Sequence, residues 1–184
     1  MSDDTAIRSQ HVRDLCRAMY ASGSIYEALH HAEAMLLLDR NSDGIQWQAH
    51  WISFVVSYCR PFTSNSVICG EKTSLILPEH RDLHDEVYLK HRHGSIAHTD
   101  PGEVTLNDLI FTIENGVIRS DPLRHHPSRE YVQGCLNMAR AVSDNLAARI
   151  ARCIARFPEL ASFKDGDYRF RIDRGLGDEW EAIP

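Results

Sequence analysis

Apolar and polar residues alternate at helical spacing over most of the chain. From about 5 to 20 the apolar positions recur every three or four residues, which predicts a helix. Gly23 and Ser24 interrupt this pattern, and Glu27 stands three residues after Ser24, the spacing of a capping box that opens a helix. We therefore expect a second helix from about 25 to 41.

A third helix is predicted from Trp47 to Tyr58, where apolar residues recur at i, i+4, i+7, i+8 and i+11. Pro61 cannot continue a helix, so this helix should end near Arg60. Residues 64–78 are expected to form a mixed connection. A fourth helix should then run over about 79–97.

After Gly102 the pattern changes from helical to alternating. Two short apolar runs, 109–113 and 117–118, flank Asn115-Gly116, the commonest two-residue hairpin turn. A small β-hairpin is therefore predicted between the fourth helix and the last one.

The longest helix should begin at Ser128 and reach about Phe157, with apolar residues at close to heptad spacing. The tail that follows Pro158 is polar, and residues 168–172 are its one strand candidate. No internal repeat is visible.

These elements predict a mainly α fold, an antiparallel bundle of four to five helices with a small β-hairpin insert around 108–119. The whole chain, 1–184, is expected to be a single domain. Its helical core would span about 5–157 and contain the insert at 105–120. A polar C-terminal tail would cover 158–184.

Composition narrows the function classes. The formal net charge of −6 argues against a broad non-specific nucleic-acid surface but leaves room for a small basic site. The N-terminus is acidic and has no apolar core of a signal peptide, and the longest apolar run, Ala34–Leu38, is too short to span a bilayer. We therefore expect a cytoplasmic protein with no membrane partner.

The cysteines are odd in number, widely spaced and without a CxxC pair. Those in apolar helical patterns are expected to be small buried hydrophobic residues of a reducing cytosol. Neither a disulfide framework nor a thiolate zinc site is predicted. The four in helical patterns are Cys16, Cys59, Cys135 and Cys153.

The segment 90–100 concentrates the chemistry of the chain, because it holds one arginine, three histidines and an aspartate. Imidazole moves protons near neutral pH, and guanidinium binds a phosphate through a planar fork of donors. On an ideal α-helix His80, His84, His91 and His98 share a sector of roughly 40°. Arg92 would lie about 120° from His98, so the pair needs a bend at Gly94 or a second subunit.

Three interpretations of this stripe remain open. The histidines can be hydrogen-bonded residues of the core, since each buried imidazole needs partners for both nitrogens. His80 and His84 have the i, i+4 spacing of two metal ligands, a weak alternative because no HExxH glutamate accompanies them. Arg92 and His98 can instead act on a phosphodiester.

The run from Arg92 to His98 resembles the Arg-x4–6-His motif of the HEPN superfamily, in which a polar residue such as His93 follows the arginine. Thr99-Asp100 is also similar to that family. The resemblance covers about 45–155 and implies a dimeric helical bundle that cleaves RNA without metal or other cofactor. It implies that His98 is the general acid or base and that Arg92 stabilises the transition state.

In the same scheme His93 is a third residue of the catalytic group, as a supporting donor, and His91, His84 and Asp100 lie around this group as supporting residues. The leading hypothesis is thus an endoribonuclease of toxin or phage-defence type, a homodimer whose partners would be RNA and an antitoxin or other protein. A non-catalytic helical interaction or RNA-binding module is the alternative. A histidine-rich metal-binding protein is the less favoured one.

Overall fold

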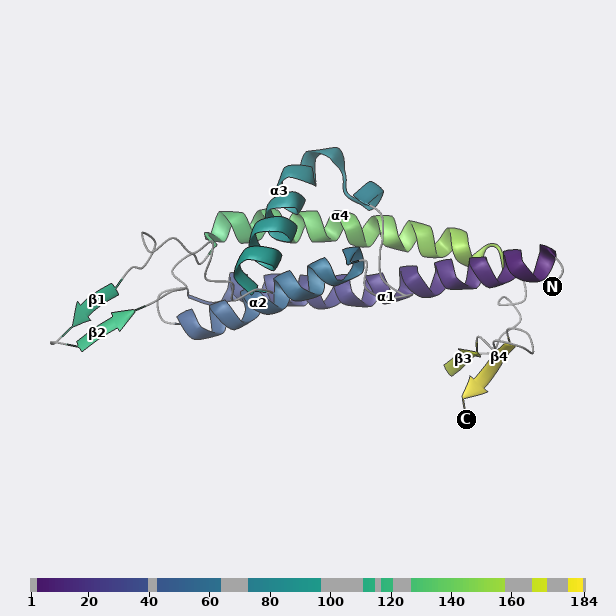
Figure 1. The fold of residues 1–184 in the computed structure, drawn as a ribbon, viewed down its shortest axis with the longest axis horizontal. Coiled ribbons are helices and arrows are strands. Elements are labelled where there is room, and N and C mark those ends of the chain that lie inside the picture. Colours follow the sequence, from purple (N-terminus) through teal and green to yellow (C-terminus); the bar gives the residue numbers. More distant parts are fainter. Residues whose placement is uncertain are drawn as a thin grey trace.

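The computed structural model describes residues 3–39, 43–63, 73–96, 111–114, 117–120, 127–157, 167–171 and 179–183. Side chains are described for 10–39, 43–63, 73–92 and 127–157. Within these ranges the protein is mainly helical, as the sequence predicts (Figure 1).

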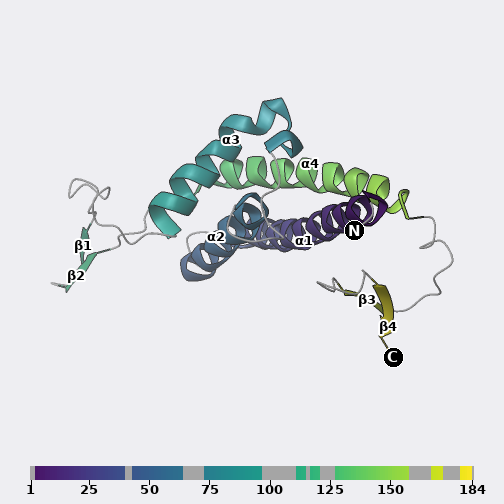
Figure 2. The same cartoon turned by 45° about the vertical axis from the view of Figure 1, so that its right-hand side comes forward.

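Two long helices form the body of the structure. Helix α1 (Asp3–Leu37) and helix α4 (Arg129–Ile154) lie side by side and run in opposite directions (Figures 1 and 2). Arg129 near the start of α4 bonds to the Leu36 carbonyl at the end of α1, and Arg140 pairs with Glu33 at 2.9 Å. The two chain segments farthest apart in the core are therefore direct neighbours.

Helix α1 is continuous through Gly23 and Ser24, so the predicted break there is wrong. Ser24 is only 4% exposed and lies within the helix interface, where a small residue fits. The buried positions follow a three-and-four spacing, which is the pattern of a helix packed along its whole length. They are Val12, Leu15, Ala18, Ala21, Ile25, Ala28, Ala32 and Met35.

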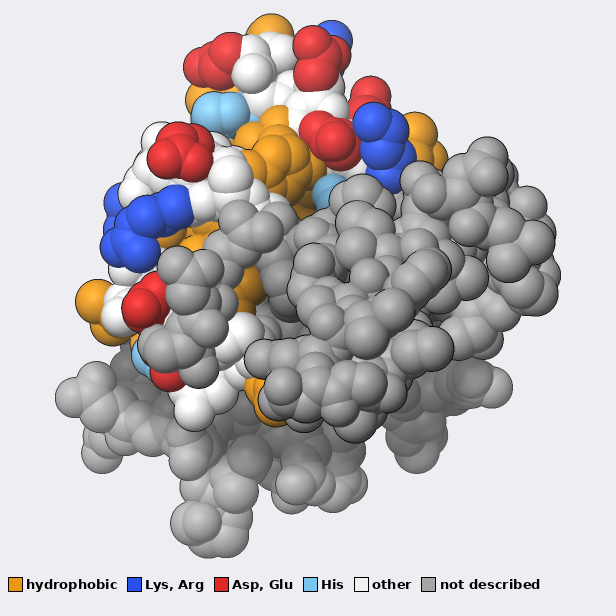
Figure 3. Space-filling model, turned by 90° about the vertical axis from the view of Figure 1, so that its left-hand side faces the viewer, with side chains coloured by type: hydrophobic (Ala, Val, Ile, Leu, Met, Phe, Trp, Pro, Cys, Tyr) orange, Lys and Arg blue, Asp and Glu red, His pale blue; other side chains and the backbone are white. Residues whose placement is uncertain are grey.

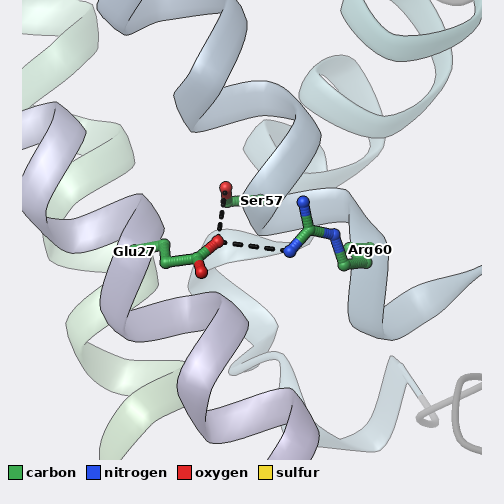
Figure 4. Close-up of polar contacts among 3 residues, drawn as sticks. All are labelled: Glu27, Ser57 and Arg60. Carbon is green, nitrogen blue, oxygen red and sulfur yellow. Dashed lines mark hydrogen bonds and ion pairs between the residues drawn. The ribbon is translucent and has the colours of Figure 1, made fainter.

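Glu27 joins α1 to helix α2 (Gly44–Cys59) instead of capping a helix (Figure 4). Its Oε2 accepts hydrogen bonds from Ser57 Oγ and from Arg60 Nη1, each at 3.2 Å. Because α2 is antiparallel to α1, these contacts lie at the C-terminal end of α2. The Ser-x-x-Glu spacing of Ser24 and Glu27 predicts the start of a helix. In the structure Glu27 instead makes a tertiary contact with α2 and Arg60.

The short helix η1 (Arg60–Phe62) ends α2 at Pro61, as predicted. Within the expected mixed connection the structure has the short helix η2 (Thr73–Leu75). Helix η3 (Pro78–His80) then leads into α3 (Arg81–Asp85) and η4 (Glu86–Ile96).

The predicted fourth helix is therefore present, but its winding differs from the expectation. Residues 86–96 form a π-helix, in which each backbone hydrogen bond spans five residues instead of four. Helix η4 packs against α2 and crosses the direction of α1 and α4 (Figures 1 and 2). The angles expected between the histidines and Arg92 assume an α-helix, so they do not hold for residues 86–96.

Helix α4 begins where the sequence predicts. Ser128 is its N-cap, and the Ser128 side chain accepts a hydrogen bond from the Tyr131 backbone N–H at 3.1 Å. Phe157, after the end of α4, is buried with Cys153 against Val12 and Leu15 of α1. This second cluster closes the end of the bundle opposite to η4.

Two pairs of short strands complete the described residues. Strands β1 (Phe111–Glu114) and β2 (Val117–Ser120) are antiparallel, with Phe111 opposite Ser120. The Asn115-Gly116 turn and both flanks of the expected insert lie outside the described residues, so the hairpin insert stays a prediction.

In the tail, strand β3 (Asp167–Arg171) pairs with β4 (Glu179–Ile183). The sequence predicted one strand here and missed its partner.

The cysteines behave as the sequence predicts. Cys59, Cys135 and Cys153 are buried, Cys16 is partly buried, and all four are free thiols. Burial raises the pKa of Cys59 to about 12, although the Arg92 charge opposes this shift, and burial also raises the pKa of Cys135. These thiols stay protonated at neutral pH and serve as core residues. Cys69 lies outside the described residues.

The continuity of α1 gives a direct test at Gly23. A Cβ added at Gly23 would have no atom within 4 Å, so Gly23→Ala should raise the free energy of unfolding by about 0.5–1 kcal/mol. Urea unfolding followed by circular dichroism measures the change. A helix start or a left-handed turn at this position would give a loss of stability instead.

Candidate functional site

Helix η4 presents Arg92 beside the C-terminal end of α2. The Arg92 guanidinium carbon lies 5.2 Å from the centroid of the Tyr88 ring, a cation–π contact. The Tyr88 hydroxyl in turn donates to the Phe62 carbonyl at 3.4 Å. The Cys59 thiol contacts the Val87 carbonyl, which ties the same turn of η4 to α2. Arg92 therefore contacts a ring whose hydroxyl is bonded to η1, the short helix that follows α2.

His84 precedes Tyr88 by four residues and is buried, with 4% of its surface exposed. Its Nδ1 is hydrogen-bonded to the Tyr58 hydroxyl at 2.9 Å. The imidazole packs edge-on against Phe62, with centroids 4.8 Å apart, and stacks with Tyr88 at 5.8 Å. This small aromatic cluster joins α2, η1, α3 and η4.

Both partners of the buried bond are neutral at physiological pH. Burial lowers the pKa of His84, and the neighbouring Asp85 opposes the shift. Burial raises the pKa of Tyr58, and the nearby Cys59 and Cys135 add to this. A neutral pair suits a site from which water is excluded.

His91 occupies a second aromatic contact, one that joins η4 to both α2 and α4. Its ring lies 5.0 Å from Trp51 and 5.9 Å from Tyr131, edge-on in each case. Burial raises the pKa of Tyr131, and negative charge on Cys135 and Glu86 would add to the shift. Glu86 also pairs with Lys90 at 3.5 Å on the exposed side of η4. His91 thus lies in helix packing, next to Arg92 in the chain.

The structure places part of the predicted site and leaves part of it open. His84, His91 and Arg92 come from one helical segment and lie over α2, and the helix continues through Gly94 to Ile96. His93 lies within η4, but its side chain is not described. His98 and Asp100 lie outside the described residues, so the predicted pairing of Arg92 with His98 stays a prediction.

The alternative metal pair receives no support from the side chains that are described. His80 is half-buried in η3, while Nδ1 of His84 is engaged with Tyr58. Among the described residues no group of three or more His, Cys, Asp or Glu side chains is placed to share a metal ion.

Sequence reasoning missed one histidine pair. His31 of α1 and His50 of α2 approach each other with Nδ1 atoms 3.1 Å apart. They are separated by 19 residues, so no motif spacing connects them. Only the antiparallel packing of the two helices brings them together.

Side chains of several types are exposed at the end of the bundle near η4. Figure 3 shows exposed hydrophobic side chains with acidic, basic and histidine side chains around them.

Comparison of the chain with known protein families, with curated proteins and with solved structures finds no match. Among the helices that the structure describes, none combines the length and apolar character needed to cross a membrane.

Removal of the Tyr58 hydroxyl tests the buried bond. Tyr58→Phe leaves Nδ1 of His84 without its partner in a buried site, so the free energy of unfolding should fall by about 1–3 kcal/mol. Tyr88→Phe is the matched control, because its hydroxyl bond is longer and only partly buried, and it should cost less than about 1 kcal/mol. Equal losses in urea unfolding would contradict a special role for the Tyr58–His84 bond.

The lowered pKa of His84 predicts a pH dependence. Below the ordinary value of about 6.5 the unfolded chain takes up a proton that folded His84 resists, so stability is complete above that value and falls as pH decreases. Urea midpoints measured from about pH 7.5 to about pH 5 should decline more steeply for the wild type than for His84→Asn, whose amide can accept the Tyr58 bond. Parallel curves would show that His84 does not contribute to the slope.

Proposed function

We propose that the protein is a metal-independent endoribonuclease of toxin or phage-defence type that uses Arg92 and His98. The observation that carries this proposal is the contact of the Arg92 guanidinium with the face of the Tyr88 ring. A guanidinium oriented before substrate arrives needs little reorganisation when charge develops on a phosphate. The resemblance of the Arg-x5-His segment to HEPN proteins supports the same assignment.

The chemistry divides between the two residues. His98 takes the proton of a ribose 2′-hydroxyl as its oxygen attacks phosphorus, and the bond from phosphorus to the 5′-oxygen breaks. The products are a 2′,3′-cyclic phosphate and a 5′-hydroxyl, whose proton comes from water. Arg92 stabilises the additional negative charge on the phosphorane-like transition state through its planar donors. A cation–π contact uses the face of the guanidinium, whereas phosphate binding uses the donors in its plane. His93 would be a supporting donor.

A two-fold dimer is the second part of this proposal, because the resemblance to HEPN proteins implies that the motifs of two subunits face each other. The spacing of Arg92 and His98 fixes no angle between them within one chain, since residues 86–96 form a π-helix instead of an α-helix. Apposition of the same segment from a second copy brings an Arg92 of one protomer to a His98 of the other. The product would be a composite site at the dimer axis.

One observation favours a second candidate, a non-catalytic helical module. Two of the predicted supporting residues, His84 and His91, are absorbed in packing against Tyr58 and Trp51. In that case the motif stabilises the bundle, and its loss changes stability without removing an activity.

Cleavage of a mixed RNA substrate in the presence of EDTA tests the enzyme. Arg92→Ala and His98→Ala should each lower the rate roughly 100-fold or more, as expected for the loss of a transition-state donor or a general acid–base. Lys90→Ala is the control, because Lys90 lies on the same helix, is mostly exposed and pairs only with Glu86 among the contacts described here. Its rate should match that of the wild type.

Two results would overturn this assignment. One is a wild type that leaves RNA intact in EDTA, and the other is cleavage that survives both substitutions. A strict monomer by light scattering would contradict the composite site. If His98→Ala lowers only stability, by about 1–3 kcal/mol, the non-catalytic module is correct.

A further inference from the structure

The interface between α1 and α2 contains a pair of facing imidazoles. Nδ1 of His31 and Nδ1 of His50 are 3.1 Å apart, and the ring centroids are 5.3 Å apart with an interplanar angle of 48°. Both residues are half-buried, so one side of the pair is open to solvent. In the absence of an ion one Nδ1–H donates to the lone pair of the other Nδ1.

We propose that His31 and His50 bind a divalent transition metal ion of the zinc class, which links α1 to α2. The distance between the nitrogens fits this use. With Zn–N bonds of about 2.0–2.1 Å, an ion would lie about 1.3 Å from the midpoint of the two atoms, with an N–Zn–N angle of about 100°. The rings now point nearly end to end, so binding turns both lone pairs to the same side.

Charged groups of both signs lie near the pair. Glu27 lies one helical turn before His31 on α1, and its negative charge acts on that imidazole. The Glu27 carboxylate is itself held by Ser57 and Arg60 of the neighbouring segment, as Figure 4 shows. His30 on the same helix stacks with Tyr26, and its charge acts on His31 in the opposite sense to that of Glu27.

The donor set selects the class of metal. Imidazole nitrogen suits zinc, copper and nickel, whereas calcium and magnesium prefer oxygen. No third His, Cys, Asp or Glu side chain among the described residues is placed to join the two imidazoles, so solvent completes the coordination. Such an ion exchanges readily and acts as a clamp between helices. It has no part in the proposed RNA chemistry, which is measured in EDTA.

Binding of an ion to the pair depends on pH. A metal needs both Nδ1 atoms unprotonated, with each remaining proton on Nε2. Affinity for zinc should therefore fall as the pH decreases and protons compete with the ion.

Isothermal titration of the untagged full chain with zinc chloride at about pH 7.5 tests the proposal. We expect one saturable site, weakened about tenfold or more by His31→Gln and by His50→Gln, because each removes half of a chelating pair. His30→Gln is the matched control and should bind zinc like the wild type. Circular dichroism establishes that each variant is folded.

Electron paramagnetic resonance of the Cu²⁺-loaded wild type gives a second measurement that does not depend on the variants folding. Coupling to two imidazole nitrogens supports the pair. The proposal is overturned by coupling to fewer, by the absence of a saturable site, or by zinc affinity that persists in a folded His31→Gln/His50→Gln double variant. The last result would assign binding to other histidines of the chain.

Discussion

Close packing along one face of α1 is the constraint on which the rest of the fold depends. The buried residues of α1 include four alanines, Ala18, Ala21, Ala28 and Ala32. Small side chains let neighbouring helices approach closely, and α1 packs against both α2 and α4. The aromatic cluster around His84 and the His31–His50 pair both depend on where this face places α2.

The same face explains why the fold was only partly predictable. Helix α4, its cap at Ser128 and the exit at Pro61 follow from local signals that tertiary packing does not oppose. Gly23-Ser24 is a local boundary signal that packing overrides, because burial over the whole length of α1 outweighs the cost of one glycine. Glu27 then bonds to α2 instead of to its own helix.

The π-helical winding of η4 could not be predicted from the sequence. The periodicity of residues 79–97 is equally compatible with an α-helix, and no residue signals a π-helix. The contacts of Tyr88 with Phe62 and of His91 with Trp51 and Tyr131 arise between segments distant in sequence. Helical state was therefore predictable, whereas the orientation of each histidine was not.

The functional residues were also only partly predictable from the sequence. Residue types in a short run singled out Arg92, and the structure adds its anchoring to Tyr88. His31 and His50 carried no signal, because a pair formed across two helices has no fixed spacing in sequence. Partners of this kind emerge only when the register of α1 against α2 is known.

The pairing of α1 with α4 also has a consequence for synthesis of the chain. Helix α1 is synthesised well before α4, the helix against which it packs most extensively, more than 90 residues later in the sequence. Contacts that distant close slowly and expose apolar surface while they are incomplete. A nascent chain that ends before residue 129 carries the alanine face of α1 with one of its two major partners absent. Premature termination would therefore yield an aggregation-prone fragment.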